Sequence, residues 1–151
     1  MLTGSGFFSC VSVVMVFEWS HRYKVDIREV DDQHKHFVDV VNTLFEAMER
    51  GEGPKVLAQT LDALARHASE HFELEHKYMR ECRYPDLGRH EAAHLEFRET
   101  LQGLQQMART EDPRMFTVRL AEFLRGWLVS HVQVEDKRMF EYRASVRPPK
   151  P

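Results

Sequence analysis

Cysteine is scarce in this sequence. Two of the 151 residues are cysteines, Cys10 and Cys82. Small secreted domains that depend on disulfide bonds are rich in cysteine, so the composition argues against a disulfide-stapled domain, although it leaves room for one bond. A reducing compartment fits this composition better, and we expect the protein to be cytoplasmic.

Long hydrophobic runs are also lacking. The longest, residues 7–17 (FFSCVSVVMVF), is too short to span a bilayer. It has no basic segment before it and no evident cleavage site after it, so it is a poor signal peptide. Met15 begins the string MVFEWS, and we favour translation from this residue. Residues 1–16 are therefore interpreted as an N-terminal extension, either an artefact of the start-codon assignment or disordered.

Neither sign of charge predominates. The 21 basic and 24 acidic residues give a net charge of −3, which favours neither nucleic acid nor a membrane surface as a partner. Hydrophobic residues make up 42% of the chain and charged residues 30%, as in ordinary globular proteins. We expect one domain with a real core, and a monomer.

Glycine and proline fall between four stretches in which apolar residues recur at helical spacing. The sequence shows no strand-like alternation and no glycine-rich phosphate loop. Four helices with short connections predict an all-α fold, an antiparallel up-down-up-down four-helix bundle. The expected helices run from the caps Asp31 and Asp32 to Arg50 before Gly51 and Gly53, from Pro54 to the turn at 84–88, from His90 to near Thr110, and from Pro113 to Tyr142.

The predicted bundle domain spans residues 17–142. Residues 18–30 are expected to form an extended N-terminal arm, with Trp19, Tyr23, Val25 and Ile27 lying against the bundle. Residues 143–151 (RASVRPPKP) are expected to be a disordered tail, because the prolines cannot continue a helix.

Seven residues with metal-binding side chains fall on the apolar stripes of the four expected helices. Polar side chains on a core face are costly unless something satisfies them. Two of the pairs have a spacing of four residues, which places both members of a pair on one helical face. The seven are His34, His71, Glu75, His90, His94, His131 and Asp136.

The composition of this set predicts two metal ions. Imidazoles and carboxylates together suit a first-row transition metal such as iron better than magnesium or calcium. Seven ligands are too many for one tetrahedral zinc site, which takes three or four, but they suit two ions that share two carboxylates. A zinc-loaded or empty helical bundle is the plainer alternative.

The spacing between His131 and Asp136 does not suit a regular α-helix. Five residues correspond to roughly 140° around the helix axis, which turns the two side chains apart. A π-bulge of one residue would return Asp136 to the face of His131, and such bulges gather at functional sites. We predict this irregularity, or else an Asp136 that reaches in from the flank.

The other four histidines are not expected to be ligands. His21 precedes the first helix, His36 faces away from His34, and His76 is about 100° round the helix from Glu75. These three are expected at the surface or beside a ligand. His67 lies one turn before His71 on the same face, and we interpret it as core packing or as a hydrogen-bonding partner.

Four strings carry a resemblance to a known family: DDQH (31–34), HFELE (71–75) followed by Met79, HEAAH (90–94) and HVQVED (131–136). With the opening EWSHRYKVDIREVDDQHK, they make residues 17–142 resemble the hemerythrins, most of all their single-domain bacterial branch, the bacteriohemerythrins. All seven ligand positions occur in order.

The resemblance implies a non-heme di-iron centre that binds dioxygen reversibly, as a hydroperoxide at an iron with an open position. His90, His94 and His131 would bind one iron, and His34 and His71 the other. Glu75, Asp136 and an oxo or hydroxo group would bridge the two ions, Fe2+ or Fe3+.

The resemblance also implies a pocket for the gas. Leu128 matches a position near the bound oxygen, and Trp127 matches an aromatic residue of the pocket wall; both would also serve as simple core packing. Two departures from the family are visible. His76 stands where many relatives have a glutamate, and His67 stands where an aromatic residue is common, which could alter affinity or autoxidation.

The donor set favours carrying oxygen over activating it. Oxygen-activating di-iron bundles use glutamate-rich sets, whereas here imidazoles outnumber carboxylates five to two. The leading hypothesis is therefore a non-enzymatic oxygen carrier, store or supplier, whose partner is dioxygen and an oxygen-using enzyme. The alternatives are an enzyme that reduces peroxide or nitric oxide on the same centre, and an oxygen or redox sensor.

Overall fold

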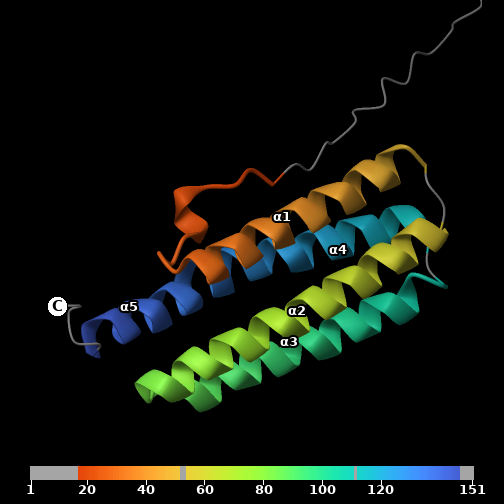
Figure 1. The fold of residues 1–151 in the computed structure, drawn as a ribbon. Helices are drawn as coiled ribbons and strands as arrows, with labels where there is room; N and C mark the ends of the chain where they lie inside the picture. The colour runs from red at the N-terminus through yellow and green to blue at the C-terminus, as the bar shows by residue number, and fades with distance from the viewer. Residues whose placement is uncertain (1–16, 52–53, 111, 147–151) are drawn as a thin grey trace, which may run out of the picture.

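A computed structural model describes residues 17–51, 54–110 and 112–146, and this part of the chain is helical without a strand. The rods run antiparallel to their neighbours along the chain, which confirms the predicted up-down-up-down four-helix bundle (Figure 1). The fourth rod is continuous but has three parts, because a π-helical segment joins α4 to α5. The elements are α1 (Arg28–Glu49), α2 (Pro54–Cys82), α3 (Leu87–Met107), α4 (Pro113–Trp127), the π-helix η2 (Leu128–Asp136) and α5 (Lys137–Val146).

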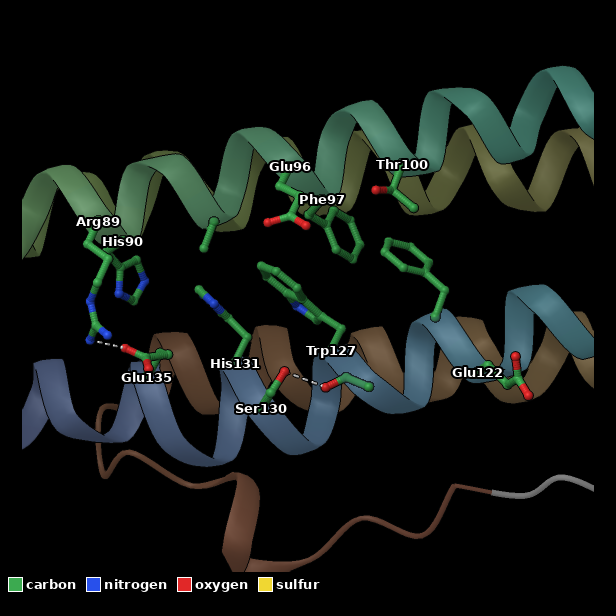
Figure 2. A pocket seen from close by; sticks show the side chains of 13 residues that line it. Arg89, His90, Glu96, Phe97, Thr100, Glu122, Trp127, Ser130, His131 and Glu135 are labelled. Atoms are coloured by element: carbon green, nitrogen blue, oxygen red, sulfur yellow. Dashed lines mark hydrogen bonds and ion pairs between the residues drawn. The ribbon is translucent and has the colours of Figure 1, made fainter.

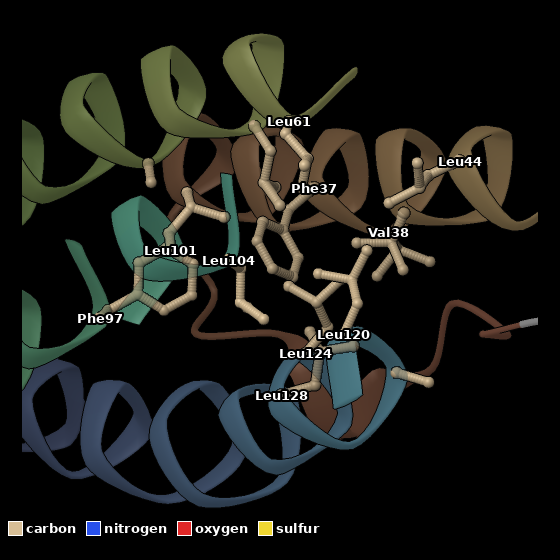
Figure 3. Close-up of a cluster of buried hydrophobic side chains, with 14 of the residues drawn as sticks. Phe37, Val38, Leu44, Leu61, Phe97, Leu101, Leu104, Leu120, Leu124 and Leu128 are labelled. Carbon is tan, nitrogen blue, oxygen red and sulfur yellow. The ribbon is translucent and has the colours of Figure 1, made fainter. Parts of the chain in front are cut away.

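The apolar core has two parts with a polar layer between them. The larger cluster fills one end of the bundle with leucine and phenylalanine side chains (Figure 3). The smaller cluster, at the other end, contains Val30, Met79, Tyr84, Met139 and Phe140. Along α1, α2 and the fourth rod, the predicted ligands fall between a residue of one cluster and a residue of the other. The core therefore encloses the candidate ligands on both sides along the bundle axis.

The N-terminal arm lies against the bundle as predicted. Trp19 and Tyr23 pack against the larger cluster, and Val25 and Ile27 against the smaller one. The backbone N–H of Phe17 donates to Oδ1 of Asn42 at 2.8 Å, and Nδ2 of Asn42 donates to the Phe17 carbonyl at 2.9 Å. The prediction of an extended arm over residues 18–30 was wrong in part, because the arm includes the 3-10 helix η1 (His21–Tyr23) and ends where α1 begins.

The predicted cap of the first helix was also wrong. Helix α1 begins at Arg28, and Asp31 lies within its first turn. The Oδ1 atom of Asp31 accepts a hydrogen bond from the backbone N–H of Val25 at 2.7 Å. This carboxylate therefore fixes the arm to the helix instead of capping it.

The other helix ends combine expected and unexpected features. Gly51, with φ at +67°, follows the end of α1 in the left-handed conformation that commonly terminates helices. Helix α2 ends at Cys82, because Arg83 adopts a φ of 54° and the N–H of Tyr84 bonds to the Met79 carbonyl at 2.9 Å. Leu87 and Gly88 belong to α3, which ends at Met107, and hydrogen-bonded turns continue to Thr110, near the predicted end.

The fourth rod extends beyond Tyr142, so the prediction that it ends there was wrong. Helix α5 continues to Val146, because Met139, Phe140 and Arg143 present one buried face to the smaller cluster. The guanidinium of Arg143 lies over the ring of Tyr78, 4.5 Å from its centroid. Residues 143–146 are thus ordered helix and not part of a disordered tail, and residues 147–151 lie outside the described part.

Some predictions concern residues that the structure does not describe. The N-terminal extension 1–16, with Cys10 and Met15, lies outside the described residues, as does Gly53. Cys82 is the one cysteine in the described ranges and forms no disulfide bond there. Among the described helices, none is long and apolar enough to cross a membrane.

The contact between Arg143 and Tyr78 predicts a stability effect at the end of α5. Replacing Arg143 with alanine removes a buried cation–π contact and should lower the free energy of unfolding by about 1 kcal/mol. Urea denaturation followed by circular dichroism measures this effect. Arg125→Ala, which changes an exposed arginine of α4, is the matched control and should have a smaller effect. Equal midpoints for the two variants would contradict the assignment.

Candidate metal centre

All seven predicted ligands converge on one point in the interior of the bundle. His34 comes from α1, His71 and Glu75 from α2, and His90 and His94 from α3; His131 and Asp136 come from η2. None of the seven is more than 5% exposed, and the two carboxylates are fully buried. The structure therefore brings together the whole set that helical spacing assigned to the core.

Their side-chain atoms form two groups that share the carboxylates. One group contains Glu75, His90, His94, His131 and Asp136, and the other contains His34, His71, Glu75 and Asp136. Within each group, one potential ligand atom from each residue lies within 4.8 Å of all the others. This division into three and two histidines is the one that the family resemblance implied.

Each carboxylate directs one oxygen to each group. Oε1 of Glu75 lies 3.3 Å from Nε2 of His71, whereas Oε2 lies 3.3 Å and 3.1 Å from the Nε2 atoms of His90 and His94. The oxygens of Asp136 divide in the same way. Oδ2 lies 3.2 Å from Nε2 of His34, and Oδ1 lies 3.2 Å and 2.9 Å from the Nε2 atoms of His90 and His131. Glu75 and Asp136 thus each face both groups of histidines.

The π-helical geometry of η2 explains how Asp136 reaches the site. In a π-helix the hydrogen bonds join residues i and i+5, so side chains five apart lie on one face. His131 and Asp136 are therefore one above the other and both buried. The predicted irregularity is confirmed, and it extends over nine residues, Leu128–Asp136.

The outer nitrogens of three histidines have partners that aim the inner nitrogens at the centre. Nδ1 of His34 donates to the carbonyl of Tyr23 at 3.0 Å, and Nδ1 of His71 donates to Oε1 of Gln33 at 2.9 Å. Nδ1 of His94 lies 3.2 Å from Nε2 of His76. When Nδ1 carries the hydrogen, Nε2 of a neutral imidazole directs its lone pair inward.

Sequence reasoning missed two of these partners. Tyr23 was singled out only for packing, and its contribution is a backbone carbonyl, which no residue type signals. Gln33 occurs inside the string DDQH, and its position next to His34 was the available signal. His76 was expected at the surface or beside a ligand, and its contact with His94 settles the latter.

The family of the chain follows from comparison with known proteins. The family described as "Hemerythrin HHE cation binding domain" matches residues 25–142. This chain belongs to the hemerythrin family. A bacteriohemerythrin of Methylococcus capsulatus is 32% identical over 107 residues, 71% of this chain and 80% of that protein. A myohemerythrin of Theromyzon tessulatum is 25% identical over 130 residues, 86% of this chain and 93% of that protein.

The centre of this family member fits metal ions on structural grounds. Both oxygens of Asp136 and Oε1 of Glu75 are buried without a hydrogen-bond partner within the described part of the chain. Nε2 atoms also face each other, at 3.2 Å between His34 and His71 and 3.0 Å between His94 and His131. Ligands at right angles about one ion, with bonds of about 2.1 Å, lie about 3 Å apart. The observed spacings suit metal cations that are coordinated by the nitrogen lone pairs and that neutralise the carboxylate charges.

Without metal, protons must compensate the buried carboxylates. Burial alone would raise the pKa of Glu75, but the charges and hydrogen bonds of His71, His90 and His94 lower it well below its usual value. Burial opposes the charged form of His90, yet the adjacent carboxylates of Asp136 and Glu75 outweigh it and raise the pKa to about 9. The site thus attracts positive charge, whether protons or metal ions supply it.

Aromatic rings hold two of the histidines in place. The ring of Phe72 stacks on His94 with centroids 3.8 Å apart, and the ring of Trp127 stacks on His131 at the same distance. Metal ligands whose rings are fixed by packing lose little conformational freedom on binding.

A small cavity lies beside the group of two histidines. Its volume is about 10 Å³, close to the minimum for one water molecule. The lining is aromatic and aliphatic apart from three histidines. It consists of His34, Phe37, His67, Ala68, His71, Phe72, Phe97, Trp127 and Val132.

The two predicted pocket residues have different places around this cavity. Trp127 forms part of the wall. Leu128 is buried in the larger core cluster and is not among the lining residues, so its role near a bound gas stays a prediction.

The remaining histidines lie outside both groups. His21 and His36 are exposed. His67 is buried beside the cavity, with its ring parallel to that of His71 and the centroids 6.4 Å apart. Burial, then the nearby His71 and His36, lower the pKa of His67 to about 4, which keeps it neutral at pH 7.

The pKa of His90 predicts how the stability of the metal-free protein depends on pH. In the folded, metal-free protein the pKa of His90 is about 9, above its ordinary value of 6.5. Protonation of His90 therefore stabilises the fold, and this contribution is fully present below pH 6.5. This contribution is lost as the pH rises through 9, with a slope of up to about 1.4 kcal/mol per pH unit. Urea unfolding between pH 6.5 and 9.5 measures it. Metal-loaded protein is the control and should vary less, whereas metal-free protein that gains stability over this range would contradict the prediction.

The contact between His94 and His76 predicts that His76 supports metal binding. His76→Phe removes the acceptor for Nδ1–H of His94 and should weaken metal affinity about 10- to 100-fold. His76→Gln offers an amide oxygen as acceptor and should retain most of the affinity. Competition with a chelator measures both variants. Wild-type affinity in His76→Phe would show that this hydrogen bond is dispensable.

Proposed function

We propose that this hemerythrin-family protein binds dioxygen reversibly at a pair of iron ions held by the seven residues. The observation that carries the proposal is the orientation of the carboxylates of Glu75 and Asp136. In each of them, one oxygen faces the group with three histidines and the other faces the group with two. This arrangement supports two ions bridged by carboxylates. A pair of ferrous ions would supply the two electrons that reversible dioxygen binding requires.

The two halves of the centre differ in the number of donors that the protein offers. One half has five residues and the other four, because the carboxylates are shared and the histidines divide three to two. An ion in the half with four donors has more of its coordination left for an exogenous ligand. We therefore assign gas binding to the side of His34 and His71.

The surroundings of that half support binding without chemical turnover. The cavity beside it is small and largely apolar, so it restricts water and proton donors. His67 is the one histidine of the lining outside the two donor groups, and it is neutral at pH 7. A wall of this kind slows the escape of a bound reduced species, which needs a proton.

We extend the proposal to the role of the protein. The excess of imidazoles over carboxylates stabilises highly oxidised iron less than the glutamate-rich sets of oxygen-activating bundles. The function is accordingly non-enzymatic: carrying, storing or delivering dioxygen, with an oxygen-using enzyme as the recipient.

Iron content and a reversible spectrum test this function. Protein purified with iron should contain about two irons per chain, and its visible spectrum should change on oxygenation and revert on deoxygenation. His71→Ala removes a donor from the half with four and should abolish the reversible change. His21→Ala, in the exposed 3-10 helix of the arm, is the control and should behave like wild type.

Three outcomes would contradict the proposal. They are a colourless protein after reconstitution, a spectrum that does not revert, and continuous consumption of oxygen and a reductant. The last would indicate an enzyme on the same centre.

A further inference from the structure

A groove lies between α3 and the fourth rod, apart from the small cavity. Its volume is about 660 Å³, within the range of sites for small organic molecules. Figure 2 shows Phe97 on α3 and Trp127 on the opposite rod directed toward one another across the groove. With Phe123 they give it an aromatic lining, and His90 and His131 also line it. The groove thus reaches two of the seven buried residues.

The aromatic lining is in direct contact with the metal centre. The ring of Trp127 stacks on that of His131, with an interplanar angle of 13° and centroids 3.8 Å apart. The ring centroids of Phe97 and Trp127 are 4.4 Å apart. A planar molecule in the groove would contact an indole ring that itself contacts a candidate ligand.

An unpartnered buried atom is a second indication of a bound molecule. Nδ1 of His90 has no hydrogen-bond partner among the described residues, although His90 is 3% exposed and lines the groove. With a metal ion at Nε2, the neutral ring of His90 would carry its hydrogen on Nδ1, and this N–H has no acceptor among the described residues. A heteroatom of a molecule in the groove would satisfy it.

The charges of the rim restrict what the groove accepts. Arg89 is the one arginine or lysine among the lining residues, and it is paired with Glu135 at 2.7 Å. Glu96 and Glu122 are exposed, one on each side of the groove. The rim is therefore negative overall and favours neutral or cationic molecules over anions.

From these observations we propose that the groove binds a planar heteroaromatic reductant, neutral or cationic, that re-reduces the iron centre. The redox step rests on the function proposed above, but the binding site does not. A dihydro form of such a molecule gives two electrons, one to each of two ferric ions. The products are two ferrous ions, the oxidised aromatic molecule and two protons, which pass to solvent.

Binding is tested with dyes of opposite charge. Iron-loaded ferric protein is titrated with methylene blue, a planar cation, and with anthraquinone-2-sulfonate, a planar anion. Quenching of tryptophan fluorescence and equilibrium dialysis report binding. The expected result is one site per chain that prefers the cationic dye. No saturable binding of methylene blue would overturn the proposal.

Two glycine variants locate the site. Gly126 lines the groove, and a Cβ added there meets no atom within 4 Å, so Gly126→Phe should fill the groove without disturbing the fold. Gly103 on α3 is equally open and does not line the groove, so Gly103→Phe is the matched control. Affinity for methylene blue should fall about tenfold or more in the first variant and stay within about twofold in the second. Equal affinities would overturn the location.

Charge variants test the preference for cations. The double variant Glu96→Gln with Glu122→Gln should weaken binding of methylene blue by about threefold or more and reduce the preference over the anionic dye. Glu99→Gln, an exposed change on α3 outside the lining, should leave both affinities unchanged. An unchanged dye preference in the double variant would overturn the role of the rim.

Reduction kinetics test the redox role separately. Stopped-flow reduction of the ferric centre by the reduced form of methylene blue should saturate with dye concentration and slow about tenfold in Gly126→Phe. An unchanged rate despite weakened binding would overturn electron entry through the groove. Protein that binds oxygen reversibly but no dye refutes this site alone, whereas dye binding without a reducible iron centre refutes the proposed function alone.

Discussion

Two ionised carboxylates buried completely in the core are the constraint on which the rest of the structure depends. Glu75 and Asp136 have no exposed surface, and a charge in such a place is costly unless positive charge lies beside it. Five imidazoles surround them at distances near 3 Å. Imidazoles can hold protons or, once deprotonated, bind metal ions. The same residues can therefore place either kind of cation beside the negative charges of the two carboxylates. The two apolar clusters enclose this layer on both sides along the bundle axis.

The local structure around the carboxylates follows from this need. A regular helix would turn Asp136 away from His131, and the π-helical segment restores it to the interior. The ring of Trp127, at the end of α4, stacks on His131 and lines both the small cavity and the wide groove. One stretch of the fourth rod therefore supplies two candidate donors, part of the wall of the small cavity and part of the wall of the groove.

Helical periodicity was sufficient to predict the architecture and the convergence of the seven residues. Both depend on side-chain spacing along single helices, which a sequence displays directly. The spacing of five between His131 and Asp136 even revealed a departure from regular geometry. The sequence alone did not predict interactions made by backbone groups, or by charged residues of types that usually lie at the surface. Asp31 is a residue type that commonly caps helices, yet its carboxylate accepts a hydrogen bond from the N–H of Val25. Arg143 lies in a stretch of sequence that resembles a disordered tail, and only the structure shows its guanidinium over the ring of Tyr78.

The hydrogen bond between the Tyr23 carbonyl and His34 makes the position of this imidazole depend on the length of the N-terminal arm. The acceptor is a main-chain carbonyl, so almost any side chain at position 23 leaves the interaction in place. What matters is the path of the arm, which sets where that carbonyl lies. The side chains of the arm contribute packing, whereas gain or loss of a single residue between the 3-10 helix and α1 would displace the carbonyl oxygen and release the imidazole. This contact therefore depends on the number of residues in the arm and not on the chemical type of the side chain at position 23.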